Sequence, residues 1–238
     1  MVAFLLSGSG ERLARGVPGL EFAVLGPVRV WRDGEELPLG SPQQRLTLAV
    51  LLLARGRVVP AAEIVAALWA VEEPLSARGT VRTYVHRLRR VLGDDDGPLR
   101  SVGNGYQLRV DEGALDLDRF FTTRNAAGQA RSTGLAQQAD RLLRDALGEW
   151  SDDALAGLPG EWAASERQRL RHLGFQTAES LAEVELEFEL GDRADLVERL
   201  ATLAEAEPLR EHVHELLMLA LYRSGRPAEA LTAFEHVR

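Results

Sequence analysis

One short stretch, Thr80 to Gly93, carries a set of side chains that could bind an anionic partner. Between Ser76 and Gly93 the sequence has five arginines, one histidine and no acidic residue, although the net charge of the whole chain is −8. Guanidinium groups pair with phosphates, and their planar fork can also bind a guanine edge in bidentate fashion. A solvated surface is the ordinary alternative, but such helices usually mix both charge signs so that i,i+4 pairs form.

The apolar residues of this stretch predict that it is an amphipathic helix. They recur at i, i+4, i+7 and i+11 and are Val81, Val85, Leu88 and Leu92. At about 100° per residue, the opposite face carries Thr83, His86, Arg87 and Arg90, with Arg82 and Arg89 at its flanks. A helix of this kind fits the major groove of duplex DNA.

Turn and strand signals surround the helix on both sides. Phe22–Leu25 and Val28–Trp31 are β-prone, and Asp33-Gly34 is a hairpin turn signal because glycine accepts a positive φ. Residues 94–110 predict an acidic loop followed by a β-hairpin with its turn at 103–105. A hairpin placed after such a helix can act as a wing that touches the neighbouring DNA backbone or minor groove.

Two further helices are predicted between the first strands and the arginine-rich helix. Residues 41–56 begin with Ser41, a good cap, and Pro42, which suits the first helical position. Residues 60–69 have the apolar spacing of a second helix. The predicted order is therefore strands, three helices and a hairpin.

The amino-acid composition of the chain changes near Leu115. Residues 1–113 hold 14 arginines against 13 acidic residues, whereas residues 114–238 hold 14 against 23. The second part consists of long Ala/Leu/Glu/Arg stretches, which favour helices. Gly191 and Gly225 lie 34 residues apart, which is the tetratricopeptide (TPR) period. We therefore expect a second, acidic unit built from helical repeats.

Both halves resemble one family of regulators. "FAVLGPVRVWRDGEELPLGSPQQRLTLAVLLLARGRVV", "TVRTYVHRLRRVLG" and "GNGYQL" resemble the OmpR/PhoB-type winged helix of Streptomyces antibiotic regulatory proteins (SARPs). "LRDALGEWSDDALAGLP" and "EAEPLREHVHELLMLALYRSGRPAEAL" resemble the bacterial transcriptional activation domain that follows it. Together the resemblances cover about residues 22–238. They imply a mixed, mainly α fold, in which a winged-helix domain precedes an all-α, TPR-like domain.

The resemblance also implies domain bounds, a site and a function. We expect a disordered extension over 1–20, the winged helix over 21–112, and the activation domain over 113–238, truncated inside a helix. The implied DNA contacts are Arg82, Thr83, His86, Arg87, Arg89 and Arg90 on the recognition helix, and Arg100 and Asn104 in the wing. The implied function is a transcriptional activator that binds promoter direct repeats, associates with itself on DNA and recruits RNA polymerase, for example at secondary-metabolite genes.

Other classes of function have weaker support in the sequence. The chain has no cysteine, and His212 and His214 would point about 200° apart on a helix, so we expect no metal or cofactor. No motif with a catalytic mechanism is legible, so an enzyme is not expected. No long apolar run predicts a membrane span, and we expect a cytoplasmic protein. A helical-repeat scaffold that binds proteins and a ligand-responsive regulator stay open as alternatives.

Overall fold

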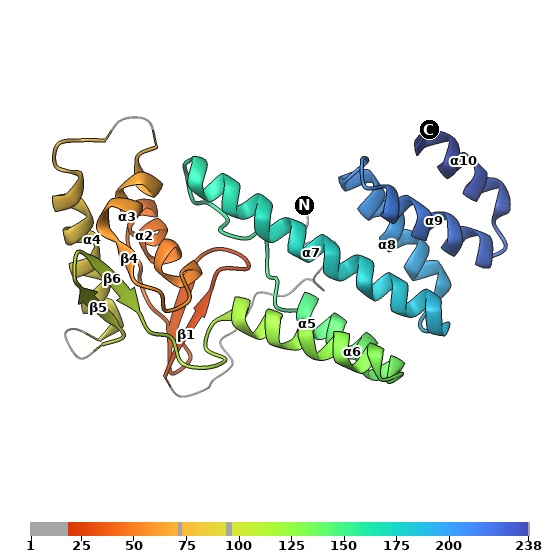
Figure 1. The fold of residues 1–238 in the computed structure, drawn as a ribbon, viewed down its shortest axis with the longest axis horizontal. Coiled ribbons are helices and arrows are strands. Elements are labelled where there is room, and N and C mark those ends of the chain that lie inside the picture. The colour runs from red at the N-terminus through yellow and green to blue at the C-terminus, as the bar shows by residue number, and fades with distance from the viewer. Residues whose placement is uncertain (1–18, 71–72, 94–96, 238) are drawn as a thin grey trace. The chain divides into compact units, whose positions relative to one another are not determined.

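The computed structural model describes residues 19–70, 73–93 and 97–237, and these residues form two compact units (Figure 1). The first, here called the wing unit, comprises 19–119 and Trp150–Arg171. The second, here called the repeat unit, comprises Phe120–Glu149 and 172–237. The expected extension over 1–20 lies almost wholly outside the described residues, as does the Asp94–Asp96 run of the predicted acidic loop.

The wing unit begins with a small antiparallel sheet. Strands β1 (Leu20–Ala23), β2 (Arg29–Arg32) and β3 (Glu35–Glu36) lie in that order. The turn between β2 and β3 has positive φ at both central residues, 52° at Asp33 and 92° at Gly34. This is the backbone that an Asp-Gly pair favours in a two-residue hairpin, and the predicted turn is confirmed.

Three helices form the core of the wing unit. They are α2 (Pro42–Leu53), α3 (Ala61–Leu68) and α4 (Ala77–Leu92), and each packs against the other two. The predicted cap of the first is confirmed, because the backbone N–H of Gln44 donates to Ser41 Oγ at 3.3 Å. Leu48, Ala49 and Leu52 on α2 are fully buried. The apolar sides of the helices therefore face one common core.

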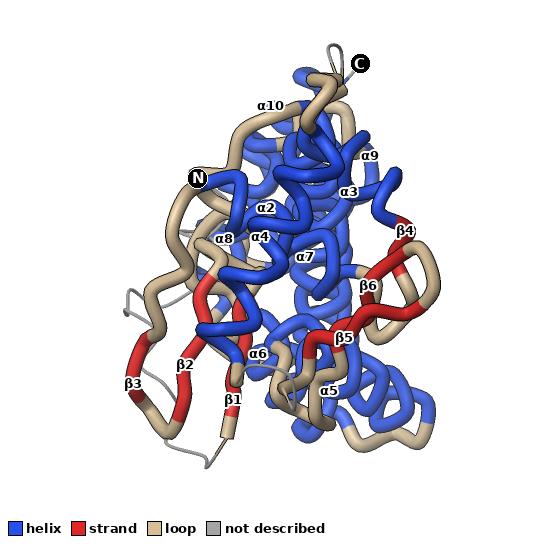
Figure 2. Tube along the Cα trace, turned by 90° about the vertical axis from the view of Figure 1, so that its left-hand side faces the viewer, coloured by secondary structure: helices blue, strands red, loops and turns tan. Residues whose placement is uncertain are grey.

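A second three-stranded sheet carries the predicted wing (Figure 2). Its strands are β4 (Val59–Pro60), β6 (Gly105–Leu108) and β5 (Leu99–Val102), in that order, and both pairings are antiparallel. A Cβ added at Gly105 would come within 2.3 Å of the carbonyl oxygen of Val59. Only glycine therefore lets β6 approach β4 this closely.

The buried backbone after β1 is held by residues far along the chain. The fully buried Asp116 carboxylate accepts hydrogen bonds from the backbone N–H groups of Val24, Leu25 and Leu117, at 2.7–3.0 Å. Phe22 N–H also donates to the Ala114 carbonyl at 2.8 Å. Buried backbone groups need partners, and here a carboxylate takes the place of a sheet neighbour.

The carbonyl groups of the same backbone are satisfied by the Trp150–Arg171 segment. Ser151 N–H donates to Leu25 O at 2.9 Å, and Leu155 N–H donates to Val24 O at 3.0 Å. Leu155 is fully buried and has a φ of 56°, an uncommon value for a branched side chain. Arg167 on the helix that follows donates to the Leu155 carbonyl and fixes the loop. Residues 114–119 and 150–171 thus complete the wing unit.

The repeat unit is entirely helical in its described residues. Its helices are α5 (Asp116–Ser132), α6 (Ala136–Leu147), α7 (Glu161–Phe188), α8 (Arg193–Ala206), α9 (Glu211–Arg223) and α10 (Pro227–Val237), of which α5 and α7 begin in the wing unit. Helix α8 packs against α9, and α9 against α10. The 34-residue spacing marks equivalent turns, because Gly191 and Gly225 both have a φ of 74° just after a helix. The expected mixed, mainly α fold is confirmed.

One buried carboxylate joins three helices of the repeat unit. The side chain of Glu185 on α7 is 1 % exposed and pairs with Arg144 from α6 and Arg199 from α8. Burial raises the pKa of Glu185, although both guanidinium groups act to lower it. A buried carboxylate is tolerated only with such partners, so these contacts favour one arrangement of the three helices.

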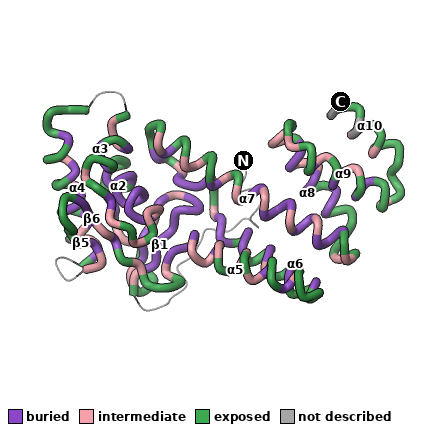
Figure 3. Tube along the Cα trace, viewed as in Figure 1, coloured by how far each residue is buried: buried purple, intermediate pink, exposed green. Residues whose placement is uncertain are grey.

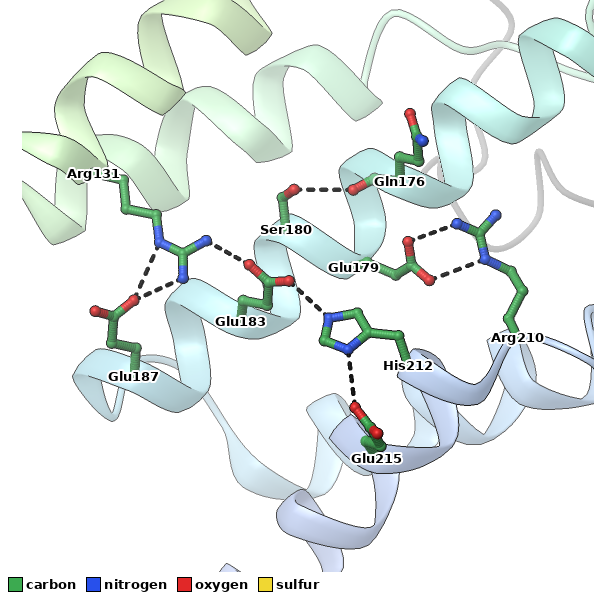
Figure 4. Close-up of polar contacts among 9 residues, drawn as sticks. All are labelled: Arg131, Gln176, Glu179, Ser180, Glu183, Glu187, Arg210, His212 and Glu215. Carbon is green, nitrogen blue, oxygen red and sulfur yellow. Dashed lines mark hydrogen bonds and ion pairs between the residues drawn. The ribbon is translucent and has the colours of Figure 1, made fainter. Parts of the chain in front are cut away.

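A second polar cluster joins α5, α7 and α9 (Figure 4). Glu183 on α7 accepts a hydrogen bond from Arg131 of α5 and pairs with His212 of α9 at 2.8 Å. The hydrogen bond with Glu183 raises the pKa of His212, and a second one with Glu215 adds to the effect. Arg210 pairs with Glu179 one turn earlier on α7. No helix in the described ranges is both long enough and apolar enough to cross a membrane.

We expect Asp116→Asn to destabilise the full chain by about 3 kcal/mol, because an amide can accept from fewer of the buried N–H groups and adds donors of its own. Urea denaturation measures the loss. Asp111→Asn, which changes an exposed carboxylate nearby, is the matched control and should be close to neutral. Equal stability of both variants would contradict the role given to Asp116.

We expect the stabilisation contributed by His212 to depend on pH. Its pKa is raised in the folded chain, so the contribution is fully present below about pH 6.5 and is lost as the pH rises through the raised value. His212→Gln should therefore cost stability at about pH 6 and much less at about pH 9. Urea denaturation at both values, with His214→Gln as control, tests this. A pH-independent loss would contradict it.

Candidate nucleic-acid interface

Buried and exposed residues alternate along helix α4 (Figure 3). The buried residues are apolar, and the exposed ones are mainly basic or polar. The predicted apolar stripe is confirmed, because Val81, Val85, Leu88 and Leu92 are each at most 2 % exposed. The helix begins at Ala77, three residues before the stretch that the sequence predicts. Burial of the stripe fixes which side chains of the helix must point outward.

The outward face consists of cationic and polar side chains. The exposed residues of α4 with side chains that could contact DNA are Arg78, Arg82, Thr83, His86, Arg87 and Arg90. Within the described part of the chain, the side chains of the four arginines and of His86 have no hydrogen-bond or ion-pair partner. Thr83 donates to the carbonyl of Gly79 at 3.1 Å and keeps its oxygen free to accept. These guanidinium groups are available to an anionic partner.

Arg89 differs from the other arginines of α4. It is half-buried, its Nε donates to the Leu99 carbonyl at 3.0 Å, and its Nη2 donates to Ser101 Oγ at 2.7 Å. Both acceptors belong to β5. Arg89 therefore joins the helix to the hairpin, an arrangement that its place on the helical wheel did not reveal.

The C-terminal end of α4 is also held. Arg32 of β2 donates from Nη2 to the carbonyl of Val91 at 2.9 Å. A cation at this end satisfies a backbone carbonyl that has no partner within the helix and complements the negative end of the helix dipole. The first sheet and the second sheet thus both contact α4 through an arginine.

The hairpin places its two predicted site residues differently. Arg100 on β5 is exposed and lies opposite Gln107 in the strand register. Asn104 lies at the tip, where its carbonyl accepts from the Ala61 N–H at 3.1 Å and its side chain is exposed. The turn has a φ of 55° at Gly103, as a two-residue turn with glycine in its first central position requires.

A groove of about 550 Å³ separates the start of α4 from the wing tip, and Arg78, Arg82 and Asn104 line it. It brings together two of the predicted residues, one from the helix and one from the wing. Arg78 was missing from the predicted set, although it lies four residues before Arg82 and so shares its face. That i,i+4 spacing is the signal that could have found it. Arg87, Arg90 and His86 lie further along the helix and do not line the groove.

The chain is similar to known transcriptional regulators along most of its length. A family model described as "Bacterial transcriptional activator domain" matches residues 115–238, and one described as "Transcriptional regulatory protein, C terminal" matches residues 34–108. The regulatory protein AfsR of Streptomyces coelicolor is 50 % identical over 220 residues, which are 92 % of this chain and 22 % of AfsR. The chain belongs to the SARP family of transcriptional regulators.

Other SARP-type relatives cover most of the chain as well. The regulatory protein DnrI of Streptomyces peucetius is 31 % identical over 229 residues, which are 92 % of this chain and 84 % of DnrI. A solved structure of Mycobacterium tuberculosis EmbR, in complex with a low-affinity phosphopeptide, has a TM-score of 0.85 and 32 % identity. That match covers 92 % of this chain and 58 % of EmbR. The chain therefore spans about a fifth of the length of AfsR and somewhat over half of EmbR.

Proposed function

We propose that this SARP-family chain is a sequence-specific, double-stranded DNA-binding transcriptional activator. The observation that carries the proposal is the exposed face of α4, whose arginines are free of intramolecular partners in the described chain. Cations that are not neutralised within their own protein can pair with phosphates and release the counterions condensed on DNA. The major groove of duplex DNA admits an α-helix such as the one that carries this face.

Within this proposal the residues have different roles. Arg87 and Arg90 lie near the middle of the exposed face and contact base edges or phosphates in the major groove. Arg82 and Arg78 face the groove beside the wing and hold the backbone of one strand. Thr83 and His86, which lie between Arg82 and Arg87 in the sequence, contact bases or phosphates. In the wing, Arg100 and Asn104 contact the adjacent backbone or minor groove.

We also propose the finer features of the family for this chain. It binds direct repeats in promoters, two copies associate on the DNA, and secondary-metabolite genes are among its targets. The division of labour follows the sequence, with DNA contact in residues 21–112 and activation in 113–238. The fold does not divide at that point, because the wing unit includes Trp150–Arg171.

RNA polymerase is the partner proposed for the repeat unit. Two adjacent helices of that unit, α9 and α10, leave large apolar side chains in solvent, with Tyr222 69 % and Leu231 66 % exposed. Apolar side chains that gather on a surface commonly mark a protein contact. Activation would then couple a DNA-bound wing unit to a polymerase-bound repeat unit.

A ligand-responsive regulator is the second candidate function, and one feature favours it. A groove of about 650 Å³ in the repeat unit is lined by α5, α6 and α7, with Arg124, Gln129 and Ser180 among its residues. Its volume lies in the range of small-molecule sites, but its lining is more polar than most such sites have. A thermal shift caused by a metabolite and lost in Arg124→Ala would favour this candidate.

We expect Arg87→Ala to weaken binding of the full chain to a promoter duplex by about 1–3 kcal/mol, which is the usual value of one bidentate base contact. Fluorescence anisotropy over a salt series measures it. Arg141→Ala is the matched control, because Arg141 is an exposed arginine of α6 in the repeat unit. If Arg87→Ala, Arg90→Ala and the parent bind equally well, the assignment to α4 is refuted.

We expect Tyr222→Ala combined with Leu231→Ser to lower transcription severalfold without changing DNA affinity, because the exposed apolar contact with polymerase is lost. The measurement is in vitro transcription with purified RNA polymerase on a template that carries the bound promoter. Arg141→Ala again serves as control. Parental transcription by the double variant would exclude this surface as the polymerase contact.

A further inference from the structure

The hydrogen bonds of Arg89 lie at an edge of the wing beside which the described residues place no further strand. In the sheet order β4-β6-β5, strand β5 has a partner on one side only. The N–H of Arg109 donates to the Pro98 carbonyl at 2.9 Å, so the carbonyl of Leu99 points away from β6. Arg89 supplies the donor that this carbonyl would otherwise lack.

Strand β5 meets the rest of the wing unit mainly through β6 on one side and α4 on the other. Strand β6 is paired with β4 over only two residues, Val59 and Pro60. Along β5, Leu99 is buried, but residues 100–102 are exposed. Gln107 Nε2 of β6 donates to the Gly56 carbonyl at 2.7 Å, and α2 and α3 also pack on β6, whereas β5 packs on α4. A shift of β5 relative to α4 must therefore be resisted from α4 itself. Two hydrogen bonds from one guanidinium to β5 oppose that motion, because they fix both the distance and the orientation of the strand.

We propose that Arg89 is a positioning residue for DNA binding, which acts by holding the wing at a fixed place beside α4. This inference rests on the proposed function. Arg89 sets where Arg100 and Asn104 lie relative to the recognition helix. It also sets the width of the groove between the wing tip and Arg82, since β5 forms one side of it through Ser101.

A direct phosphate contact is the competing role for Arg89. Two of its nitrogens are used within the chain, and only Nη1 has no partner among the described residues. The two roles differ in what they require of the side chain. A direct contact needs mainly the positive charge, whereas the positioning role needs the planar fork that reaches Leu99 and Ser101 together.

Arg89→Lys and Arg89→Ala in the full chain separate these roles. The probe is a promoter duplex to which the parent binds, and the readouts are anisotropy and hydroxyl-radical footprinting. Positioning predicts that both variants bind about tenfold more weakly, with protection lost at the wing and kept under α4. A direct contact predicts that Arg89→Lys keeps the parental affinity and footprint, which would overturn the proposal.

A double-mutant cycle gives an independent measure. If Arg89 acts through the wing, adding Arg100→Ala to Arg89→Ala weakens binding less than the two single effects predict. Adding Arg87→Ala should be additive, because that residue lies on the other side of the helix from the hairpin bonds. If the effects of Arg89→Ala and Arg100→Ala on the binding free energy are additive, the inference is overturned, while the proposed function stays intact.

Hydrogen exchange of the free protein tests the mechanical part without DNA. Amides of 99–108 should exchange faster in Arg89→Ala and, to a smaller degree, in Ser101→Ala, which removes one of the two bonds and is the milder change. Unchanged exchange in both variants would overturn the inference. If the parent chain does not bind duplex DNA at low ionic strength, the proposed function is overturned, and this role of Arg89 with it.

Discussion

The rest of the wing unit depends on how the irregular backbone of Val24–Gly26 finds hydrogen-bond partners in the core. Asp116 takes the N–H groups of the first two residues, and the 151–156 loop supplies donors for the carbonyls. A buried backbone without such partners would cost several hydrogen bonds. The wing unit is therefore completed by segments that the activation-domain family model covers.

Contacts among the strands and helices of residues 29–102 hold the basic face in place. Helix α4 contacts the first sheet through Arg32 and the wing through Arg89, while its apolar stripe packs on α2 and α3. The other four arginines of α4 have no ion-pair partner in the described chain. Charge is thus divided by role, since arginines that face the protein serve as structural donors and those that face solvent stay available for a polyanion.

The helices of the repeat unit bury carboxylates as well as apolar side chains. Glu185 is surrounded by α6, α7 and α8 and is held by two arginines, and Glu183 pairs with Arg131 and His212. Such groups stabilise a fold only when every partner is present. A stacking that separated α6 or α8 from α7 would leave the buried Glu185 carboxylate without one of its two arginines.

The sequence by itself determined the three helices of the wing unit, the Asp33-Gly34 turn, the cap at Ser41 and the buried stripe of α4. Each of these follows from local geometry or from periodicity, which act within a few residues. It also predicted which face of α4 is exposed. Only the tertiary structure decided that Arg89 bonds to β5, that Arg78 lines the groove with Asn104, and that Asp116 and the 151–156 loop complete the wing unit. Those contacts join residues 10 to more than 100 positions apart, and no periodicity in one sequence records which distant donor meets which acceptor.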